Sequence, residues 1–224
     1  MAAKTVVVIC AHTDDEALGC GGTLARHSQN GDSVYAIFLA DGVTSRPGAT
    51  AAELASRQAA ADKAGQELGI IQAFYLGFCD NQLDSLPLLS IVQAIENILI
   101  KIQPEIVYTH HIGDLNIDHR ITHQAVVTAC RPLPGGSIKQ IYSFEVLSST
   151  EWQTPGYLPF IPTAFVDISD LWSVKESALL CYQTEMRDEP HSRSIQNVLN
   201  LAKLRGNSVG LPLAEAFMLI RSII

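Results

Sequence analysis

One imidazole and three carboxylates crowd into five positions near the start of the chain, directly after an apolar run. The segment reads VVVICAHTDDEALGCGG, and its polar cluster consists of His12, Asp14, Asp15 and Glu16. Adjacent carboxylates repel one another, and a carboxylate near apolar surroundings costs free energy unless something compensates its charge. Either these groups point into water, or a cation lies among them.

A second polar cluster follows another apolar run, in the segment THHIGDLNIDHRITH. It contains His110, His111, Asp114, Asn116, Asp118, His119 and His123. Five of the seven histidines of the chain therefore belong to these two clusters. Zinc binds imidazole nitrogen and carboxylate oxygen, and a catalytic zinc site uses about three protein ligands with one position left for water. This concentration of histidines and carboxylates predicts a site for a divalent metal ion.

His12 and Asp15 lie three positions apart, so both can converge on one ion. A third ligand from the second cluster would complete a His/Asp/His set. A bound metal lowers the pKa of its water to about 7. A carboxylate that does not bind the ion, such as Asp14, could then remove a proton from that water.

These residues also have plainer interpretations. Asp14 or Asp15 could cap a helix, and Glu16 could simply complement the helix dipole. We expect His27 and His191 to be surface residues. The glycines of GCGG lack the GxGxxG spacing, and the carboxylates before them would repel a pyrophosphate, which disfavours an NAD-type oxidoreductase.

Four apolar runs alternate with segments of helical character through the first two thirds of the chain. The expected strands are 5–11, 33–40, 73–78 and 105–111, and the expected helices are 15–30, 51–68, 86–102 and 118–130. Continuous apolar runs indicate strands of a parallel sheet that is buried on both faces. The alternation predicts an α/β fold, Rossmann-like and doubly wound, with a mostly parallel sheet and helices on both faces. Both polar clusters lie at the carboxyl ends of strands, where such sheets bind ligands.

The last third has a different pattern. We expect strands at 138–146 and 163–168 with a loop between them, and helices near 171–182 and 193–205. The segment 214–222 is compatible with a strand or a helix. We expect 1–224 to be a single domain, with about 138–224 as an elaboration of it.

The composition narrows the class of protein. An apolar fraction of 47% and a charged fraction of 17% are typical of a globular protein. The net charge of −8 and the lack of a basic block argue against a nucleic-acid partner. We expect neither a secretory signal nor a membrane span. The five scattered cysteines lack CxxC spacing, so reduced thiols in a cytoplasmic enzyme are expected.

The two clusters together resemble the signature of a known family. AHTDDEALGCGG resembles the AHPDDE motif of the PIG-L/LmbE family of zinc-dependent N-deacetylases, and GDLNIDHRITHQAV resembles the distal half of that signature. The stretch KESALLCYQTEM…PHSRS…LAKLRGNSVGLPLAEAF resembles a common form of the same family, so the resemblance covers nearly the whole chain. It implies that His12, Asp15 and His119 bind zinc. It also implies that Asp14 is the general base and returns the proton to the leaving amine.

The chain departs from the family pattern at the oxyanion position. Family members commonly read HPDH where this sequence reads NIDH, and the first histidine helps to stabilise the oxyanion. Asn116 occupies that position and can donate a hydrogen bond, but it cannot carry a positive charge. His111 or His123 could supply the missing charge. Thr13 replaces the signature proline, which removes only a φ restriction.

Further residues are candidates for binding substrate. Arg57 lies where relatives often have an arginine near the bound sugar, although a helix-surface arginine is the alternative. Asp80 and Asn81 could bind sugar hydroxyls or form a plain turn. His191 and Arg193 could hold an anionic part of a substrate.

The resemblance implies a zinc-dependent hydrolase that removes an N-acyl group, most often acetyl, from an amino sugar or sugar conjugate, with zinc-bound water as nucleophile. Another divalent metal also suits a His/Asp ligand set. The alternatives are a catalytically inactive metal-containing carbohydrate-binding domain and a deacylase of a related non-carbohydrate amide. The expected partner is a small-molecule N-acetyl amino sugar, and a homo-oligomer is compatible with the family.

Overall fold

The apolar run before His12 forms an inner strand of a seven-stranded sheet. The computed structural model describes residues 3–224. The strands are β1 (Thr5–Cys10), β2 (Ser33–Ala40), β3 (Ile70–Phe78), β4 (Ile106–His110), β5 (Gln140–Phe144), β6 (Ala164–Asp167) and β7 (Ala214–Ser222). They lie in the order β3-β2-β1-β4-β5-β7-β6. The strands β1 to β5 run parallel, and β7 is antiparallel to both β5 and β6.

The strand order reverses between β1 and β4. The chain first builds β2 and β3 on one side of β1, and then places β4 and β5 on the other side. In the register, Val7 lies opposite Val107 and Ile9 opposite Thr109, so the two strands end at the same level. A crevice at such a reversal is the usual ligand site of an open α/β sheet. The two polar clusters of the sequence both begin at this point.

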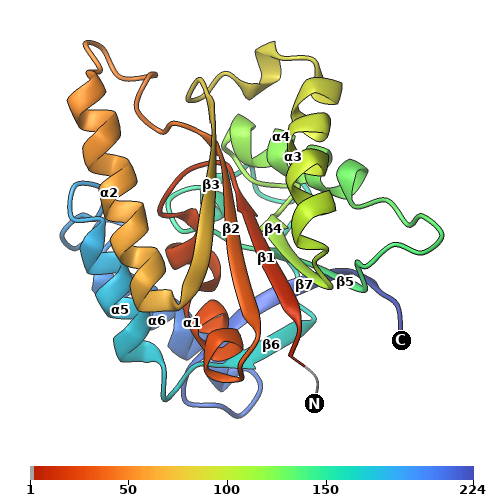
Figure 1. Ribbon diagram of the computed structural model, residues 1–224. Coiled ribbons are helices and arrows are strands. Elements are labelled where there is room, and N and C mark those ends of the chain that lie inside the picture. Colours follow the sequence, from red (N-terminus) through yellow and green to blue (C-terminus); the bar gives the residue numbers. More distant parts are fainter. Residues whose placement is uncertain (1–2) are drawn as a thin grey trace.

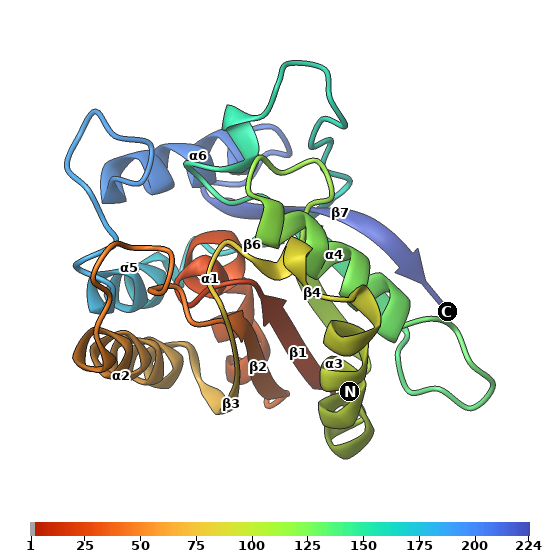
Figure 2. The same ribbon diagram turned by 90° about the horizontal axis from the view of Figure 1, so that it is seen from above.

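Helices cover both faces of the sheet (Figures 1 and 2). They are α1 (Asp15–Gln29), α2 (Ala51–Leu68), α3 (Leu88–Ile102), α4 (Ile117–Ala129), α5 (Trp172–Cys181) and α6 (Ile195–Asn207). The helices α3 and α4 pack on one face, and α1, α2, α5 and α6 lie on the other. Along β1, Val6 and Val8 face one core cluster while Val7 and Ile9 face the other. The predicted α/β class, a mostly parallel sheet with helices on both faces, is therefore confirmed.

The glycine-rich run after the first cluster serves helix packing. A Cβ atom on Gly19 would lie 2.3 Å from the ring of Phe144, and one on Gly22 would lie 2.6 Å from Ile168. Side chains at these positions would force α1 away from the sheet. These glycines therefore allow close approach of the helix, a role that requires no bound nucleotide.

The sequence predicts most elements to within a few residues. A short 3-10 helix, Leu83–Ser85, precedes α3, which begins at Leu88. The segment 214–222, left open by the sequence, is the strand β7. Three cysteines are buried, Cys79 is exposed, and Cys181 is intermediate, all as free thiols. Among residues 3–224, no helix has both the length and the apolar character needed to cross a membrane.

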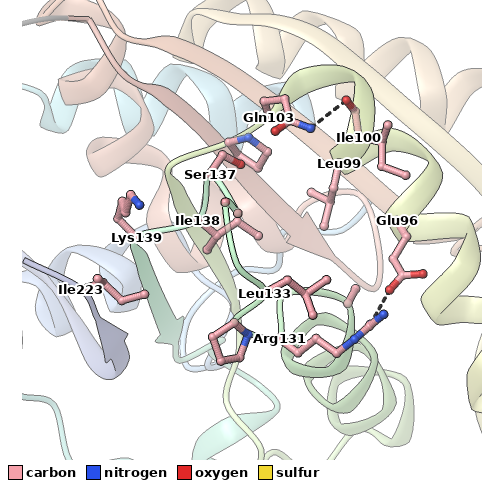
Figure 3. A pocket seen from close by; sticks show the side chains of 15 residues that line it. Glu96, Leu99, Ile100, Gln103, Arg131, Leu133, Ser137, Ile138, Lys139 and Ile223 are labelled. Carbon is pink, nitrogen blue, oxygen red and sulfur yellow. Dashed lines mark hydrogen bonds and ion pairs between the residues drawn. The ribbon is translucent and has the colours of Figure 1, made fainter.

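A cavity of about 490 Å³ lies near the amino ends of β4 and β5, between the ends of α3 and α4 (Figure 3). Its wall includes Leu99, Ile100 and Leu133, together with the Arg131–Glu96 ion pair. The two polar clusters lie at the opposite, carboxyl edge of the sheet. This cavity is thus separate from the residues that the sequence analysis selects for chemistry.

Candidate active site

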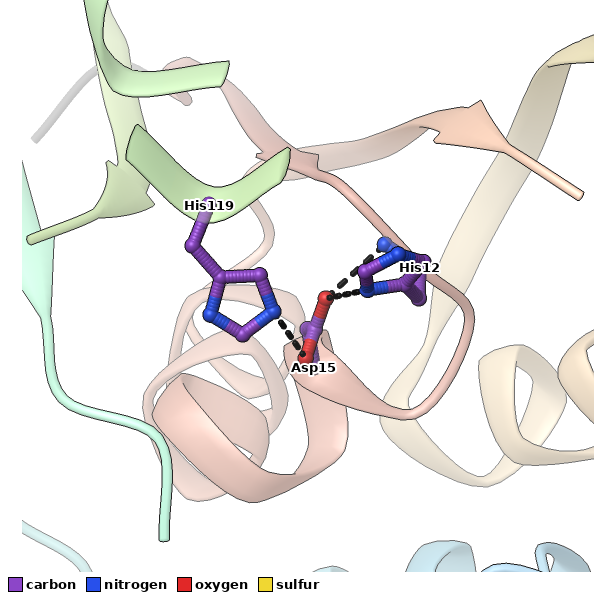
Figure 4. Close-up of side chains that lie close together, drawn as sticks. All are labelled: His12, Asp15 and His119. Atoms are coloured by element: carbon purple, nitrogen blue, oxygen red, sulfur yellow. Dashed lines mark hydrogen bonds and ion pairs between the residues drawn. The ribbon is translucent and has the colours of Figure 1, made fainter. Parts of the chain in front are cut away.

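His12, Asp15 and His119 come together where β1 and β4 end (Figure 4). Nδ1 of His12 lies 3.5 Å from Oδ2 of Asp15, and Nε2 of His119 lies 3.4 Å from Oδ1 of Asp15. All three side chains are buried, and their potential ligand atoms lie within 4.8 Å of one another. Two imidazoles thus face one carboxylate, as a His/Asp/His metal site requires.

Carboxylates behind both rings determine which nitrogen is free. Nε2 of His12 lies 3.0 Å from Oδ1 of Asp80 and 3.2 Å from Oδ2 of Asp118. Nδ1 of His119 lies 3.2 Å from Oδ1 of Asp114. Because a carboxylate only accepts hydrogen bonds, these ring nitrogens carry the protons. Nδ1 of His12 and Nε2 of His119 then face Asp15 and are the ring nitrogens left to bind an ion, which is the carboxylate–histidine–metal arrangement of known metal sites.

His12, Asp80 and Asp118 form a second group close enough to hold an ion. Asp118 is fully buried, and its oxygens accept hydrogen bonds from the amide nitrogens of Asn81 at 2.7 Å and Leu83 at 3.0 Å. Its carboxylate is therefore already committed to the backbone and to His12. The donor chemistry favours His12, Asp15 and His119 as the ligand set, with Asp118 supporting His12.

The histidines around Asp15 keep it ionised. Burial alone would raise the pKa of Asp15, but the neighbouring His119 holds that pKa well below its ordinary value. His110 stacks on His119 with ring centroids 3.9 Å apart, and its Nε2 accepts the amide hydrogen of Ala11 at 2.9 Å. Burial and the neighbouring His119 lower the pKa of His110 to about 4. His110 is thus a neutral support of the site, a role that the sequence analysis did not assign.

Asp14 lies beside the ligand set but makes different contacts. Its Oδ2 lies 3.0 Å from Nη1 of Arg193, and its Oδ1 lies 3.4 Å from Nη2 of Arg57. Asp14 occupies the N-cap position of α1, yet its carboxylate points to these guanidinium groups rather than to the helix. Burial raises its pKa, while Arg193 and Arg57 oppose that increase. The side chain is only 2% exposed, so it is a fixed carboxylate within the site.

Glu16 and His27 differ from the simple roles considered for them. Glu16 is fully buried, accepts the amide hydrogen of Asp14 at 3.0 Å, and receives a hydrogen bond from the hydroxyl of Tyr182. Burial raises the pKa of Glu16 to about 8. His27 lies between Asp32 and Tyr108, at 2.7 and 2.9 Å, instead of pointing into water. His191 is exposed, as expected.

A polar cavity of about 220 Å³ opens onto the ligand set. Besides the three ligand candidates, it is lined by Asp14, Arg57, Asp80, Asn81, Asn116 and Arg193. Most of the predicted site residues therefore surround one cavity. Ser148 and Ser149 also line it, and Oγ of Ser149 lies 3.4 Å from Nδ1 of His119. These serines lie in a loop whose sequence gives no sign of a function.

Asn116 presents a donor to this cavity. Its Oδ1 accepts the amide hydrogen of Asp118 at 2.8 Å, which caps α4 and fixes the orientation of the amide. The Nδ2 group is therefore directed to the opposite side, 3.4 Å from Oδ1 of Asn81. An NH₂ group held in this way can donate to an oxygen in the cavity.

Arg57 lines the cavity although much of its hydrogen-bonding capacity is used within the protein. Nε donates to Oγ1 of Thr13 at 2.9 Å, and Nη2 donates to the carbonyl oxygen of Thr13 at 2.7 Å. Nη1 pairs with Glu185 at 2.5 Å. The side chain is 9% exposed, so Arg57 does not behave as an ordinary helix-surface arginine.

His111 and His123 are held elsewhere. Nε2 of His111 donates to the carbonyl oxygen of Leu158 at 2.7 Å, and the ring packs edge-on against Phe160. Nδ1 of His123 donates to the carbonyl oxygen of His110 at 2.7 Å. The structure thus does not bring these two histidines together with the ligand set.

Known proteins share parts of this sequence and this fold. The family model described as PIG-L, GlcNAc-PI de-N-acetylase, matches residues 7–130. An uncharacterized deacetylase, YaiS of Escherichia coli K12, is 33% identical over 182 residues, which cover 79% of this chain and 89% of the relative. The 4-oxalmesaconate hydratase of Pseudomonas putida is 26% identical over 197 residues, which cover 80% of this chain and 72% of the hydratase. The structure of N,N'-diacetylchitobiose deacetylase from Pyrococcus horikoshii superposes with a TM-score of 0.80 at 22% identity, covering 98% of this chain and 84% of that one.

Proposed function

The chain belongs to the PIG-L family, and from this premise we propose that it is a metal-dependent hydrolase that removes an N-acyl group, most often acetyl, from an amino sugar or sugar conjugate. The observation that carries the proposal is the position of Asp14. This buried carboxylate lies next to the ligand set in sequence and lines the same cavity, but it is directed to two arginines. A site that only bound metal and sugar would not need it.

The donor set suits zinc. Two imidazole nitrogens whose partner nitrogens are held by carboxylates, plus one carboxylate oxygen, are the ligands that catalytic zinc uses. His12, Asp15 and His119 would hold the ion. When bound, zinc polarises the amide carbonyl and makes water more acidic.

The residues of the chain supply the remaining chemistry. Asp14 takes a proton from the attacking water and then passes it to the departing amine nitrogen. The Nδ2 group of Asn116 donates a hydrogen bond to the oxyanion that forms on the former carbonyl oxygen. Arg57, Asp80 and Asn81 contact the sugar. The cavity of about 220 Å³ has room for one hexosamine ring at the reacting position.

One relative favours a second candidate. The hydratase of Pseudomonas putida adds water, and the same pairing of a metal site with a buried base can activate water for that reaction. Addition of water to an unsaturated acid is therefore a competing function for this cavity. A metal-containing sugar-binding domain without catalysis is a third.

One panel of assays separates these functions. The protein loaded with zinc is incubated with N-acetylglucosamine, with its β-1,4 disaccharide, with an N-acetylated amine that is not a sugar, and with an unsaturated oxo acid. We expect release of free amine from the sugars, measured by fluorescence after amine labelling, and little release by Asp14→Asn. Loss of the oxo acid's ultraviolet absorbance without amine release would support a hydratase. Binding of sugar by zinc-loaded protein without any release would support a binding domain.

A further inference from the structure

The hydroxyl of Tyr182, in the last third of the chain, is connected to the proposed base through one side chain. Tyr182 follows the end of α5 and donates a hydrogen bond to Oε1 of Glu16. Oε2 of Glu16 accepts the amide hydrogen of Asp14 at 3.0 Å. We propose that Tyr182 and Glu16 are positioning residues that hold the backbone of Asp14 so that its carboxylate faces the cavity. This proposal rests on the proposed function, because it assigns Asp14 the role of base.

The backbone of Asp14 needs such support. Its φ angle is 105° and its ψ angle is −27°. A residue with a Cβ atom rarely adopts this left-handed region, and it stays there only where surrounding contacts impose it. The adjacent Asp15 must at the same time turn toward His12 and His119. A relaxed φ at Asp14 would rotate the two carboxylates relative to each other.

The hydrogen bonds around this turn come from several elements. Glu16 holds the amide of Asp14, and Arg57 from α2 holds the carbonyl oxygen and the hydroxyl of Thr13. Glu16 can serve as a fixed anchor because Tyr182 fixes its other oxygen. Tyr182 is 1% exposed and Glu16 is fully buried, so water cannot easily replace either bond.

Burial of Glu16 has a cost that core packing alone would not justify. A buried carboxyl group needs partners for both oxygens, and Tyr182 and the Asp14 amide provide one each. An apolar side chain would fill the same space beside the core residues without that cost. The pair is therefore best explained by the position that it imposes on Asp14.

Tyr182→Phe tests the proposal because it removes the hydroxyl and retains the ring. We expect kcat to fall about 10- to 100-fold with KM and zinc affinity unchanged, since a displacement of about 1 Å in a catalytic group has an effect of this order. Tyr108→Phe is the matched control. Tyr108 is also buried, at 4% exposure, and its hydroxyl has His27 as partner, outside the cavity. This control should leave kcat within about twofold of the wild type.

Two replacements of Glu16 give a second test. Glu16→Gln keeps an oxygen for the Asp14 amide and an NH₂ group that can donate to the oxygen of Tyr182, whereas Glu16→Leu keeps neither. We expect Glu16→Gln to retain more kcat than Glu16→Leu. If Tyr182→Phe lowered kcat, raised KM and lowered zinc affinity by similar factors, the site would be loosened as a whole, and the proposal would be overturned. So would a Tyr182→Phe enzyme that matches the Tyr108→Phe control.

Hydrogen exchange at the Asp14 amide separates this proposal from the proposed function. We expect that amide to exchange faster in Tyr182→Phe than in Tyr108→Phe, whether or not the enzyme is active. If the wild type releases no amine from any substrate, the deacetylase function fails while the exchange rates still decide the positioning role. Equal exchange rates in the two variants would refute that role.

Discussion

The Nε2 atom of His119 lies 3.4 Å from Oδ1 of Asp15. The helix α4, which follows β4, is therefore in contact with the turn that follows β1. This proximity follows from the strand order, because β4 returns to pair with β1. Neither cluster can form the proposed site alone, since the first supplies His12 and Asp15 and the second supplies only His119. Folding of the sheet and assembly of the ligand set are therefore one event.

Zinc should stabilise the folded chain. The proposed ligands converge only in the native state, so an ion at about 100 times its Kd should add about 2.7 kcal/mol to the free energy of unfolding. For a chain of this size, that corresponds to a rise in Tm of about 5–10 °C. Differential scanning fluorimetry with and without zinc measures the shift. His119→Ala should remove most of it, and an equal shift in that variant would place the ion elsewhere.

Asp118→Asn should weaken zinc binding without removing a ligand. An amide NH₂ near Nε2 of His12 disfavours the proton there and leaves Asp80 alone to hold it, which shifts the ring toward a proton on Nδ1, the atom that faces Asp15. Loss of such a supporting carboxylate typically lowers metal affinity about 10- to 100-fold. Competition with a zinc-chelating dye measures the change. Asp32→Asn is the control, because Asp32 also pairs with a histidine, His27, away from the cavity.

Asp14→Asn should separate catalysis from metal binding. The amide cannot take a proton from water, so turnover should fall by a factor of about 10²–10⁴. His12, Asp15 and His119 are unchanged in this variant, so its zinc content by elemental analysis should match that of the wild type. Full activity in Asp14→Asn would remove Asp14 from the role of base.

Strand position was sufficient to predict that the two polar clusters meet, and the family signature selected His119 within the second cluster. Parallel strands end at one edge of the sheet, and the polar residues after β1, β3 and β4 line one cavity there. His12, Asp15 and His119 could therefore be selected from the pattern and the family signature. The single domain over 1–224, the homo-oligomer and the cytoplasmic location stay predictions of the sequence.

The direction of individual side chains could not be predicted in the same way. His110 and His111 are neighbours at the end of β4 and project to opposite sides, so only His110 stacks on His119. His123 lies one helical turn beyond His119 and bonds to the backbone of β4 instead. No local sequence pattern distinguishes these histidines from His119, the proposed metal ligand.

Contacts between residues far apart in the sequence could not be predicted from the sequence pattern either. A glutamate in the first turn of a helix usually interacts with the helix dipole in water. Glu16 is buried because Tyr182, far along the chain, packs over it and supplies a hydroxyl. That contact depends on how α5 packs against α1, which spacing within either segment does not specify.

A second buried contact between the same helices gives a prediction about stability. Nζ of Lys175 on α5 pairs with Oε1 of Glu215 on β7 at 2.5 Å and donates to the carbonyl oxygen of Leu18 on α1 at 2.9 Å. Glu215 also accepts the amide hydrogens of Gly22 and Thr23 at 2.9 and 2.7 Å. This ion pair therefore joins three elements within the protein interior.

Lys175→Met should lower the free energy of unfolding by about 3–5 kcal/mol, because it leaves the carboxylate of Glu215 buried without a counter-charge. Urea denaturation followed by circular dichroism measures the loss. Arg26→Met is the matched control, since the Arg26–Asp170 pair lies at the surface and such pairs contribute under about 1 kcal/mol. Adding Glu215→Gln to Lys175→Met should recover part of the stability by removing the uncompensated charge. A Lys175→Met protein as stable as Arg26→Met would show that the buried pair contributes no more than an exposed one.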